Sequence, residues 1–476
     1  MLKLYNDLGR KKEVFKTLDQ IVRIYSCGPT VYDYVHIGNL RTFAFEDLLV
    51  RFLKYKGYNV IHVRNLTDVD DKIIKALNNS KKTLKEYTDF YINSFFEDCK
   101  KLRLQDSSYY PRATEYIDKM VDFIYDLIRK GFAYKSDDGS VYFKISKFKD
   151  YGKLSKLNKK ELKLGGSGRI NSDEYSKEEL NDFVLWKAYT PKDGKIFWNT
   201  KLGKGRPGWH IECSVMSTSL LGDTLDIHSG GEDLIFPHHE NEIAQSEAHS
   251  GKQFSRFWLH SRHLLVNSKK MSKSLGNFYT LRDLEKQNFF PLALKLLFLS
   301  AHYKNQLNFT FDSLKVMQKN LIDINLLIAK LVNYFSETEF NEDIHNKVQE
   351  KSDEIIKNIK NALDNDLNSP LALKYVYDYV SYANSLVSGG TINKKTADLI
   401  LDTFEVIDTI FGLFDFPEKV KEDLENKLWE RYNARKSKDF KTSDKLRKEL
   451  ESMGYIIFDI PNGFTVVKNQ TKKKIK

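Results

Sequence analysis

The sequence predicts an α/β protein built on a parallel sheet, followed by a helical bundle and a small C-terminal unit. Residues 21–79 alternate strand-like and helix-like segments, which is typical of parallel α/β units. Residues 200–260 return to this pattern after 120–199 interrupt it, so we expect 120–199 to be an insertion. Apolar residues at helical spacing through 310–412 predict the bundle.

Length and composition limit the class of protein. A chain of 476 residues, 41% hydrophobic and 30% charged, suggests about three folded domains of ~150 residues each. No run of about 18 apolar residues occurs, and the first residues lack the apolar core of a signal peptide. We therefore expect a cytoplasmic protein without a membrane partner. The three cysteines, Cys27, Cys99 and Cys213, do not form a disulfide framework.

The net charge of +11 permits a polyanionic partner such as nucleic acid. Only 16 of the 76 basic residues are arginine, and lysine is frequent along the whole chain. The basic charge therefore allows RNA binding but does not demonstrate it.

The first α/β unit is predicted from its local signals. The segment IVRIYS, before Cys27, is expected to be a short strand. Gly57 is expected to end the first helix, and Asp68 is the expected N-cap of the second helix. The four elements in order are a strand at 21–26, a turn and helix at 36–57, a strand at 58–66 and a helix at 67–79.

The insertion and the C-terminal part also carry recognisable patterns. Asp138-Gly139 predicts a hairpin within 131–145, and a loop rich in glycine and serine is expected at 164–174, before a β-rich segment at 182–189. The C-terminal segments comprise amphipathic helices at 314–335 and 397–414, a small charged unit at 418–467 and a basic tail that ends the chain.

The segment FPHHENEIAQSEA, residues 236–248, combines histidines and glutamates at a predicted helix start. Pro237 suits the first turn of a helix. His238 and Glu242 are four residues apart and share one face, as two ligands of a metal ion would. From these residues alone, a charged and solvated first turn is the better interpretation, because two ligands do not make a site.

Two further motifs suggest phosphate binding. HIGN, His36 to Asn39, follows a strand and opens a helix, where Gly38 lets a phosphate approach and the helix N-terminus offers free N–H groups. The segment NSKKMSKSLGNF, 267–278, is a compact cationic loop that can stabilise charge on a leaving pyrophosphate. Its lysines and serines are Lys269, Lys270, Ser272, Lys273 and Ser274.

Together, HIGN and KMSKS resemble the two signatures of class I aminoacyl-tRNA synthetases. The blocks SCGPTVYDYVHIGNLRTF, RNLTDVDDKI, GRPGWHIECSVM and GGEDLIFPHHENEIAQSEA, with ARKSKDFKTSDKLRKEL near the C-terminus, are similar to those of the cysteinyl-tRNA synthetase family. This resemblance covers nearly the whole chain.

The resemblance implies a Rossmann-type catalytic domain with an inserted domain, then a helical bundle and a small anticodon-binding unit. The implied domains are 1–119 and 200–253 for the two catalytic halves, 120–199 for the inserted acceptor-end domain, 254–312 for the KMSKS-bearing stem-contact region, 313–415 for the anticodon-binding bundle, 416–467 for the small C-terminal domain and 468–476 for the tail.

The resemblance also implies a zinc site. In the family, zinc is held by two cysteines, a histidine and a glutamate, and the matching positions are Cys27, Cys213, His238 and Glu242. Zinc accepts these ligand types and lowers the pKa of a bound thiol, so it can distinguish cysteine from serine without an editing domain. Cys99 is then a structural thiol, and His239 and Glu240 are expected to be structural partners.

The remaining implied site residues fall into two groups. The cysteine pocket comprises Gly28, Thr67, Trp209 and His228. The ATP-binding set comprises His36, Gly38, Asn39, Gly230, Gly231, Asp233, Lys270, Ser272 and Lys273. Within this set, His36 and Asn39 are expected to act at the α-phosphate, and Lys270 and Lys273 at the β- and γ-phosphates.

The reaction implied is the activation of L-cysteine by ATP with Mg²⁺, which gives cysteinyl-adenylate and pyrophosphate, followed by transfer to the tRNA for cysteine. One zinc ion per chain and a monomeric protein are expected. At the C-terminus, Gly463-Phe464-Thr465-Val466 departs from the family pattern, and Phe464 becomes the candidate for stacking on an anticodon base.

Three other functions compete with this one. A ligase that passes cysteine to an amino sugar would leave the ~160 residues after position 312 without a role. A non-catalytic RNA-binding paralogue would be expected to lack a metal ligand or signature lysine, and none is missing. A simple nucleotidyltransferase would explain neither the KMSKS block nor the four zinc-ligand positions.

Overall fold

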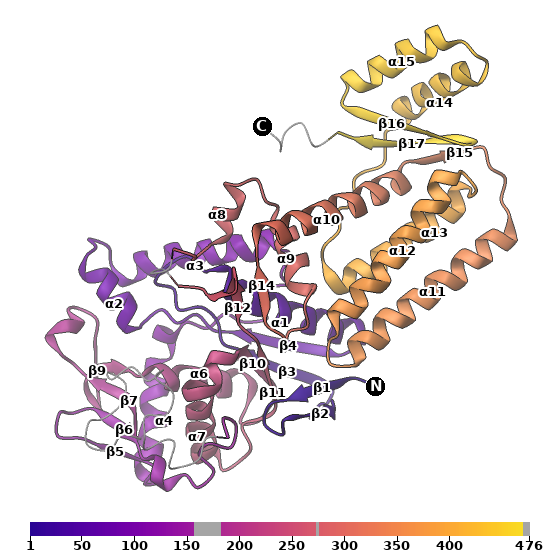
Figure 1. Ribbon diagram of the computed structural model, residues 1–476. Coiled ribbons are helices and arrows are strands. Elements are labelled where there is room, and N and C mark those ends of the chain that lie inside the picture. Colours follow the sequence, from indigo (N-terminus) through magenta and orange to yellow (C-terminus); the bar gives the residue numbers. More distant parts are fainter. Residues whose placement is uncertain (157–181, 273–275, 470–476) are drawn as a thin grey trace. The chain divides into compact units, whose positions relative to one another are not determined.

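Strands and helices alternate through the first half of the chain, and helices dominate the second half, in the computed structural model (Figure 1). The structure describes residues 1–156, 182–272 and 276–469. The chain divides into two units, residues 1–281 with 303–308, and residues 282–302 with 309–476. The expected loop at 164–174, Lys273, Ser274 and the end of the tail lie outside the described residues.

A four-stranded parallel sheet forms the centre of the first unit and confirms the predicted fold class. Its strand order is β11-β10-β3-β4, and the pairs β11·β10, β10·β3 and β3·β4 are all parallel. Helix α1 contacts β4, β10 and β11, and α6 contacts β3. The strands and these helices are β3 (Ile21–Ser26), β4 (Asn59–Arg64), β10 (Leu225–Gly231), β11 (Ser255–Ser261), α1 (Ile37–Tyr55) and α6 (Trp209–Leu221).

Capping residues explain where the first helices begin. His36 caps α1, because its side chain accepts a hydrogen bond from the backbone N–H of Asn39. The expected N-cap of the second helix, Asp68, is wrong. Asp70 caps α2 (Asp71–Asn78), while Asp68 accepts hydrogen bonds from the backbone N–H and the hydroxyl of Thr114.

The predicted hairpin in the insertion is present and belongs to a five-stranded sheet with the order β5-β6-β7-β9-β8. All its pairs are antiparallel. The sheet continues past residue 199 to Pro207, so β8 crosses the expected end of the insertion and β9 lies beyond it. Its strands are β5 (Ala133–Lys135), β6 (Val141–Phe143), β7 (Phe183–Ala188), β8 (Trp198–Thr200) and β9 (Gly203–Pro207).

Several further strands and helices precede the helical bundle, and one later strand, β14, joins them. An antiparallel hairpin, β1 with β2, lies at the N-terminus, and a small sheet has the order β13-β12-β14. These elements are β1 (Lys3–Asn6), β2 (Lys11–Val14), α3 (Leu84–Lys101), α4 (Ile117–Arg129), α7 (Glu240–Ser250), β12 (Leu264–Val266), β13 (Lys269–Lys270), α8 (Leu281–Glu285) and β14 (Leu307–Phe309).

The second unit contains the predicted helical bundle. Its helices bury apolar stripes against one another, and α10 contacts α9, α12 and α13. Asn341, Asn368 and Asn393 cap three of these helices. The helices are α9 (Pro291–Leu299), α10 (Phe311–Val332), α11 (Glu342–Asp364), α12 (Ser369–Gly389) and α13 (Lys394–Phe411).

The C-terminal part is a helix pair on an antiparallel sheet of order β15-β17-β16. The expectation that Phe464 offers its ring to a base is wrong in this structure. Phe464 is 0% exposed, and its ring packs against Phe335, Trp429 and Tyr432. The elements are β15 (Tyr334–Ser336), α14 (Glu422–Lys436), α15 (Phe440–Ser452), β16 (Tyr455–Ile460) and β17 (Gly463–Lys468).

Among the described residues, no helix is both long enough and apolar enough to cross a membrane.

Candidate active site and metal centre

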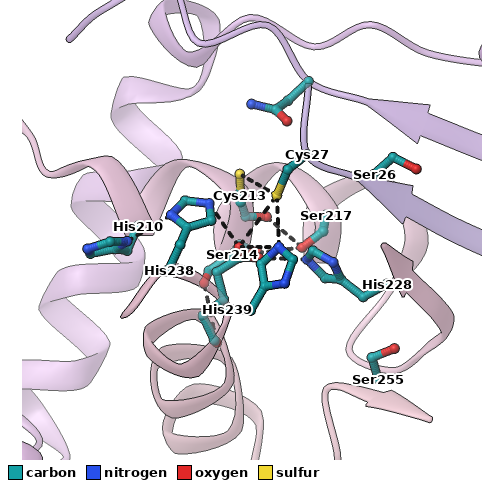
Figure 2. Close-up of polar contacts among 12 residues, drawn as sticks. Ser26, Cys27, His210, Cys213, Ser214, Ser217, His228, His238, His239 and Ser255 are labelled. Atoms are coloured by element: carbon teal, nitrogen blue, oxygen red, sulfur yellow. Dashed lines mark hydrogen bonds and ion pairs between the residues drawn. The ribbon is translucent and has the colours of Figure 1, made fainter. Parts of the chain in front are cut away.

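The candidate site lies at the carboxyl ends of β10 and β3, the two central strands of the parallel sheet. Ligands of parallel α/β sheets bind at this edge, where the strand order reverses. Cys27 directly follows β3, and Cys213 lies on α6. His238 belongs to the short turn Ile235–His239, and Glu242 is in the first turn of α7. The two cysteine side chains point toward one another, with His210 and His238 on one side and His228 and His239 on the other (Figure 2).

The structure brings the four predicted zinc ligands together. One donor atom from each of Cys27, Cys213, His238 and Glu242 lies within 4.8 Å of the others, and all four residues are buried. The two Sγ atoms are 3.9 Å apart, His238 Nε2 is 3.0 Å from Glu242 Oε1, and Cys27 Sγ is 3.7 Å from the same oxygen. The pairing of His238 with Glu242 across one helical turn is therefore confirmed.

A second set of donors overlaps the first. Cys27, His228, His239 and Glu242 also have donor atoms within 4.8 Å of one another. His239 Nε2 lies 3.3 Å from Cys27 Sγ. His239, which we expected to be a structural partner, therefore lies close enough to belong to the cluster. Glu240, in contrast, accepts hydrogen bonds from the backbone N–H groups of Gly152, Leu154 and Ser155, which is the structural role expected for it.

Charges within the cluster shift the ionisation of its groups. Burial raises the pKa of the Glu242 carboxyl, but the nearby His228 and His238 outweigh this effect and bring the pKa down to about 2. Burial also raises the pKa of the Cys213 thiol, while hydrogen bonds with Cys27 and His238 bring it down to about 6. For Cys27, burial keeps the pKa well above its usual range. Burial lowers the pKa of His238, but Glu242 and Cys213 raise it to about 10, so the His238 imidazolium balances part of their negative charge.

The donor set fits zinc. Thiolate, imidazole and carboxylate are the ligand types that zinc prefers, and a tetrahedral site uses four of them or three with an open position. The buried cluster supplies two thiols, an imidazole and a carboxylate at mutual distances suited to one ion. Both thiols are free rather than joined as a disulfide.

Two histidines that the sequence did not single out, His210 and His260, hold the rings of His238 and His239. His210 Nδ1 lies 2.8 Å from His238 Nδ1, which directs Nε2 of His238 to the cluster. His239 Nδ1 is 2.8 Å from His260 Nε2, and His260 Nδ1 is 2.9 Å from Asp7 Oδ2. Such outer partners fix the orientation of metal-binding imidazoles. Asp7 and His260 are 253 residues apart in the chain, so no local pattern could reveal this chain of contacts.

Two of the four residues expected to line a cysteine pocket, Trp209 and His228, contact ligands of the cluster. The Trp209 ring stacks on His238, with centroids 4.2 Å apart, and His228 Nε2 lies 2.8 Å from Glu242 Oε2. Thr67 is buried. Gly28 must be glycine, because an added Cβ would lie 1.8 Å from the backbone oxygen of Asn65.

The HIGN motif lies at the N-terminus of α1, as predicted. His36 Nδ1 accepts a hydrogen bond of 3.2 Å from the backbone N–H of Asn39, and the exposed side chain of Asn39 faces solvent. A Cβ on Gly38 would lie 3.0 Å from His36 Nδ1 and 3.1 Å from Met271 Cε. Gly38 therefore keeps the helix start open and lets the KMSKS segment approach it.

The two signature motifs meet in the first unit. His36 forms an antiparallel bridge with Thr280, just after KMSKS, and the His36 ring contacts Phe278 edge-on at 5.2 Å. Lys270 is exposed, and its carbonyl accepts a hydrogen bond from Asn277, whose own side-chain oxygen accepts from the N–H of Ser272. Lys273, the second lysine of the motif, lies outside the described residues.

The remaining expected ATP residues end β10 and begin the turn after it. A Cβ on Gly230 would lie 2.9 Å from Leu234 and 3.0 Å from His239, and one on Gly231 would lie 2.5 Å from Asp233 Oδ1. Asp233 itself is exposed. These glycines allow the end of β10 to pack closely against the turn that follows it.

A buried polar network beneath the site was not predicted. Arg64 Nη2 donates to Glu46 Oε2 over 2.8 Å, and Ser229 Oγ donates to Glu46 Oε1 over 3.0 Å. Ser26 Oγ lies 2.8 Å from Ser229 Oγ and 2.9 Å from His62 Nε2. The network holds the end of β3, directly before Cys27, against the end of β10.

Known proteins resemble the chain over nearly its whole length. The catalytic domain model of the class I (C) tRNA synthetases matches residues 14–319, and the DALR domain model matches residues 358–415. The cysteine–tRNA ligase of Chlamydia muridarum is 47% identical over 475 residues, covering 98% of this chain and 99% of that protein. The enzyme of Chlamydia pneumoniae is 45% identical, covering 97% of both chains.

Solved structures show the same fold at low sequence identity. Mycobacterium tuberculosis methionyl-tRNA synthetase in complex with methionyl-adenylate matches with a TM-score of 0.64 and 12% identity, covering 83% of this chain and 92% of that chain. A putative arginyl-tRNA synthetase from Campylobacter jejuni matches with a TM-score of 0.52 and 15% identity, covering 86% of this chain and 96% of that chain.

Proposed function

The chain belongs to the cysteine–tRNA ligase family of class I aminoacyl-tRNA synthetases, and on that premise we propose that it selects L-cysteine with a zinc ion and attaches it to tRNA through cysteinyl-adenylate. The observation that carries this proposal is the meeting of two thiols, an imidazole and a carboxylate from separate segments at the carboxyl end of the sheet. The substrates are ATP with Mg²⁺, L-cysteine and the tRNA for cysteine.

Cys27, Cys213, His238 and Glu242 would hold the zinc ion, one per chain. Bound zinc supplies an attachment for the thiolate of the substrate, a bond that serine forms far less well. A pocket that judged shape alone would separate near-isosteric side chains by only about 1–3 kcal/mol. Selection by this chemistry makes a separate editing domain unnecessary.

The residues around the cluster orient the amino acid. Gly28 follows Cys27, and Thr67 forms backbone hydrogen bonds with Pro29 and Val31. Trp209 and His228 contact the ligands directly. These four residues would hold cysteine so that its carboxylate points to the HIGN motif. Holding the carboxylate in position next to the α-phosphate would promote the reaction without a general base.

In the first step, an oxygen of the cysteine carboxylate attacks the α-phosphate of ATP, and the bond to pyrophosphate breaks. His36 and Asn39, at the positive end of α1, would stabilise the α-phosphate. Lys270 and Lys273 would neutralise the charge that develops on the leaving pyrophosphate. Gly230, Gly231, Asp233 and Ser272 would complete the nucleotide site. In the second step, a hydroxyl of the terminal ribose of tRNA attacks the carbonyl of the adenylate and releases AMP.

The other parts of the chain would bind tRNA. The insertion would support the acceptor end, and the helical bundle with the small C-terminal part would bind the anticodon region. Family likeness also favours a monomer, located in the cytoplasm. Because Phe464 is buried, an aromatic contact with the anticodon would need another ring of this part. Tyr432, which is half-buried, lies beside Phe464.

Exchange of pyrophosphate into ATP tests this function. The purified, zinc-loaded protein is expected to catalyse the exchange with cysteine and not with serine. Cys213→Ser should lose bound zinc and the cysteine-dependent exchange together, whereas Cys99→Ser, a buried thiol outside the cluster, should retain both. Folded, zinc-loaded protein that shows no exchange with cysteine would refute the proposal.

A further inference from the structure

Glu212 is a buried carboxyl next to the metal cluster for which the proposed function gives no role. It lies on α6 between Trp209 and Cys213 and is 1% exposed. Its Oε2 has no hydrogen-bond partner among the described residues. A buried polar atom without a partner costs free energy comparable to a lost hydrogen bond. Such an atom beside a binding site indicates a ligand group that is absent here.

Hydrogen bonds join Gly28, Asn65 and Thr67, and Thr67 in turn acts on the Glu212 carboxyl. The backbone N–H of Gly28 donates to Asn65 Oδ1 over 2.8 Å, and Asn65 Nδ2 donates to Thr67 Oγ1 over 3.1 Å. Burial holds the pKa of the Glu212 carboxyl well above its usual range, and the Thr67 hydroxyl, whose oxygen accepts from Asn65, opposes this rise. These contacts leave Glu212 Oε2 for another donor.

A narrow cleft reaches this carboxyl. Glu212, Trp209 and Asp70 are among its lining residues, and its free volume is about 10 Å³. A volume of roughly this size accommodates a single water molecule, and an ammonium group is of similar size. Trp209 connects the cleft to the metal cluster, because its ring also stacks on His238.

The charges that line the cleft favour a cation. Lys187 and Arg206 are its basic residues, and both form ion pairs with Asp71. Arg206 also pairs with Asp193. The cations of the cleft are therefore neutralised by other carboxylates, and Glu212 keeps an acceptor oxygen for a donor that a ligand must bring.

We propose that Glu212 binds the ammonium group of the substrate amino acid and that Asn65 and Thr67 position it for this contact. The inference rests on the proposed function, since it assumes that cysteine binds at the cluster. The nitrogen and the sulfur of cysteine are attached to neighbouring carbon atoms, so their binding groups must also be neighbours. Trp209 links the two places, because it lines the cleft with Glu212 and its ring stacks on His238 of the cluster. The contact makes the site specific for amino acids over other thiols.

Ligands that lack one charged group test this assignment. The zinc-loaded wild-type protein and Glu212→Gln are titrated with L-cysteine, with cysteamine, which lacks the carboxylate, and with 3-mercaptopropionate, which lacks the ammonium group. A charged hydrogen bond makes the expected loss about tenfold to hundredfold in Kd for cysteine and cysteamine. For 3-mercaptopropionate, the Kd of the variant should stay within about threefold of the wild-type value, because no ammonium contact exists to be lost.

Two further variants keep the test decisive. Glu240→Gln removes another buried carboxylate, one that accepts hydrogen bonds from backbone N–H groups of 152–155, and should change all three affinities by the same factor. Glu212→Asp keeps the charge and should retain part of the preference for ligands with an ammonium group, which matters if Glu212→Gln does not fold.

The outcomes separate the inference from the function beneath it. Equal weakening of all three ligands by Glu212→Gln, or no weakening of any, would overturn the ammonium assignment while leaving the proposed function intact. Wild-type protein that is folded and zinc-loaded but does not bind L-cysteine would overturn both.

Discussion

The buried ion pair of Glu46 and Arg64 provides a quantitative test of how the site is supported. The two side chains are 1% and 2% exposed, and Arg64 Nη2 lies 2.8 Å from Glu46 Oε2. The guanidinium also lies over the Phe43 ring, 4.7 Å from its centroid. Removing one partner of such a pair leaves an uncompensated buried charge and typically costs about 3–5 kcal/mol. We expect Glu46→Gln to lower the free energy of unfolding by about 3 kcal/mol, the lower end of this range, because glutamine keeps one acceptor for Arg64.

The complementary variant, Arg64→Met, should behave differently with pH. Burial already raises the pKa of Glu46, and Arg64 is the largest influence that opposes this rise. Without Arg64, the pKa of Glu46 in the folded protein rises further above its unfolded value of about 4.3. Between these two values the folded state binds more protons than the unfolded state, so stability falls as pH rises, by up to about 1.4 kcal/mol per pH unit. Glu46→Gln has no carboxyl to titrate and should lack this slope.

Urea unfolding at pH 5.5 and pH 8, followed by tryptophan fluorescence, measures both effects against wild type. The unit that contains the ion pair includes four of the five tryptophans. Asp122→Asn is the control, because its ion pair with Lys201 is 72% and 51% exposed, and it should cost less than about 1 kcal/mol. A loss below about 1 kcal/mol for Glu46→Gln, or equal pH dependence of the two ion-pair variants, would refute the reasoning.

The remaining predictions concern the pocket, the metal and the C-terminal part. Gly28→Ala places a methyl group against the Asn65 backbone oxygen, so it should lower stability by about 1–3 kcal/mol and weaken cysteine binding; a wild-type melting temperature and cysteine affinity would contradict this clash. His210→Gln removes the partner that orients His238 and should weaken zinc binding about tenfold to hundredfold in competition with a chelator; unchanged zinc affinity would show that the contact has no orienting role. Phe464→Ala should destabilise the C-terminal part by about 3–5 kcal/mol, because it empties a buried site. Hydrogen exchange of its strands measures this loss, and unchanged protection with weaker tRNA binding would instead indicate direct contact with a base.

Much of the fold was predictable because its signals are local. The strand before Cys27, the helix ended by Gly57 and the hairpin around Asp138-Gly139 each depend on residues within one element or turn. The N-cap of α2 was misassigned because three aspartates lie within four residues. Only the structure shows that Asp68 is engaged by Thr114, 46 residues away.

The candidate site was predictable in part. The His238–Glu242 pair follows from helical spacing, but the addition of Cys27 and Cys213 needed the family resemblance, since their spacing matches no metal-binding pattern. The contacts of His210, His260 and Glu212 depend on residues brought together by folding, and a single sequence carries no signal for them. Phe464 was expected to be available to RNA, because a sequence does not reveal which aromatic side chains of a small unit form its core.

Charging of tRNA with labelled cysteine tests the central claim most directly. The zinc-loaded protein is incubated with ATP, labelled L-cysteine and a transcript of the tRNA for cysteine, and the acid-precipitable label is counted before and after mild alkali. We expect ATP-dependent label in the tRNA that alkali releases, as for an ester, and none with labelled serine. Activation of cysteine without any transfer to tRNA would contradict the account and indicate that the chain delivers cysteine to another acceptor.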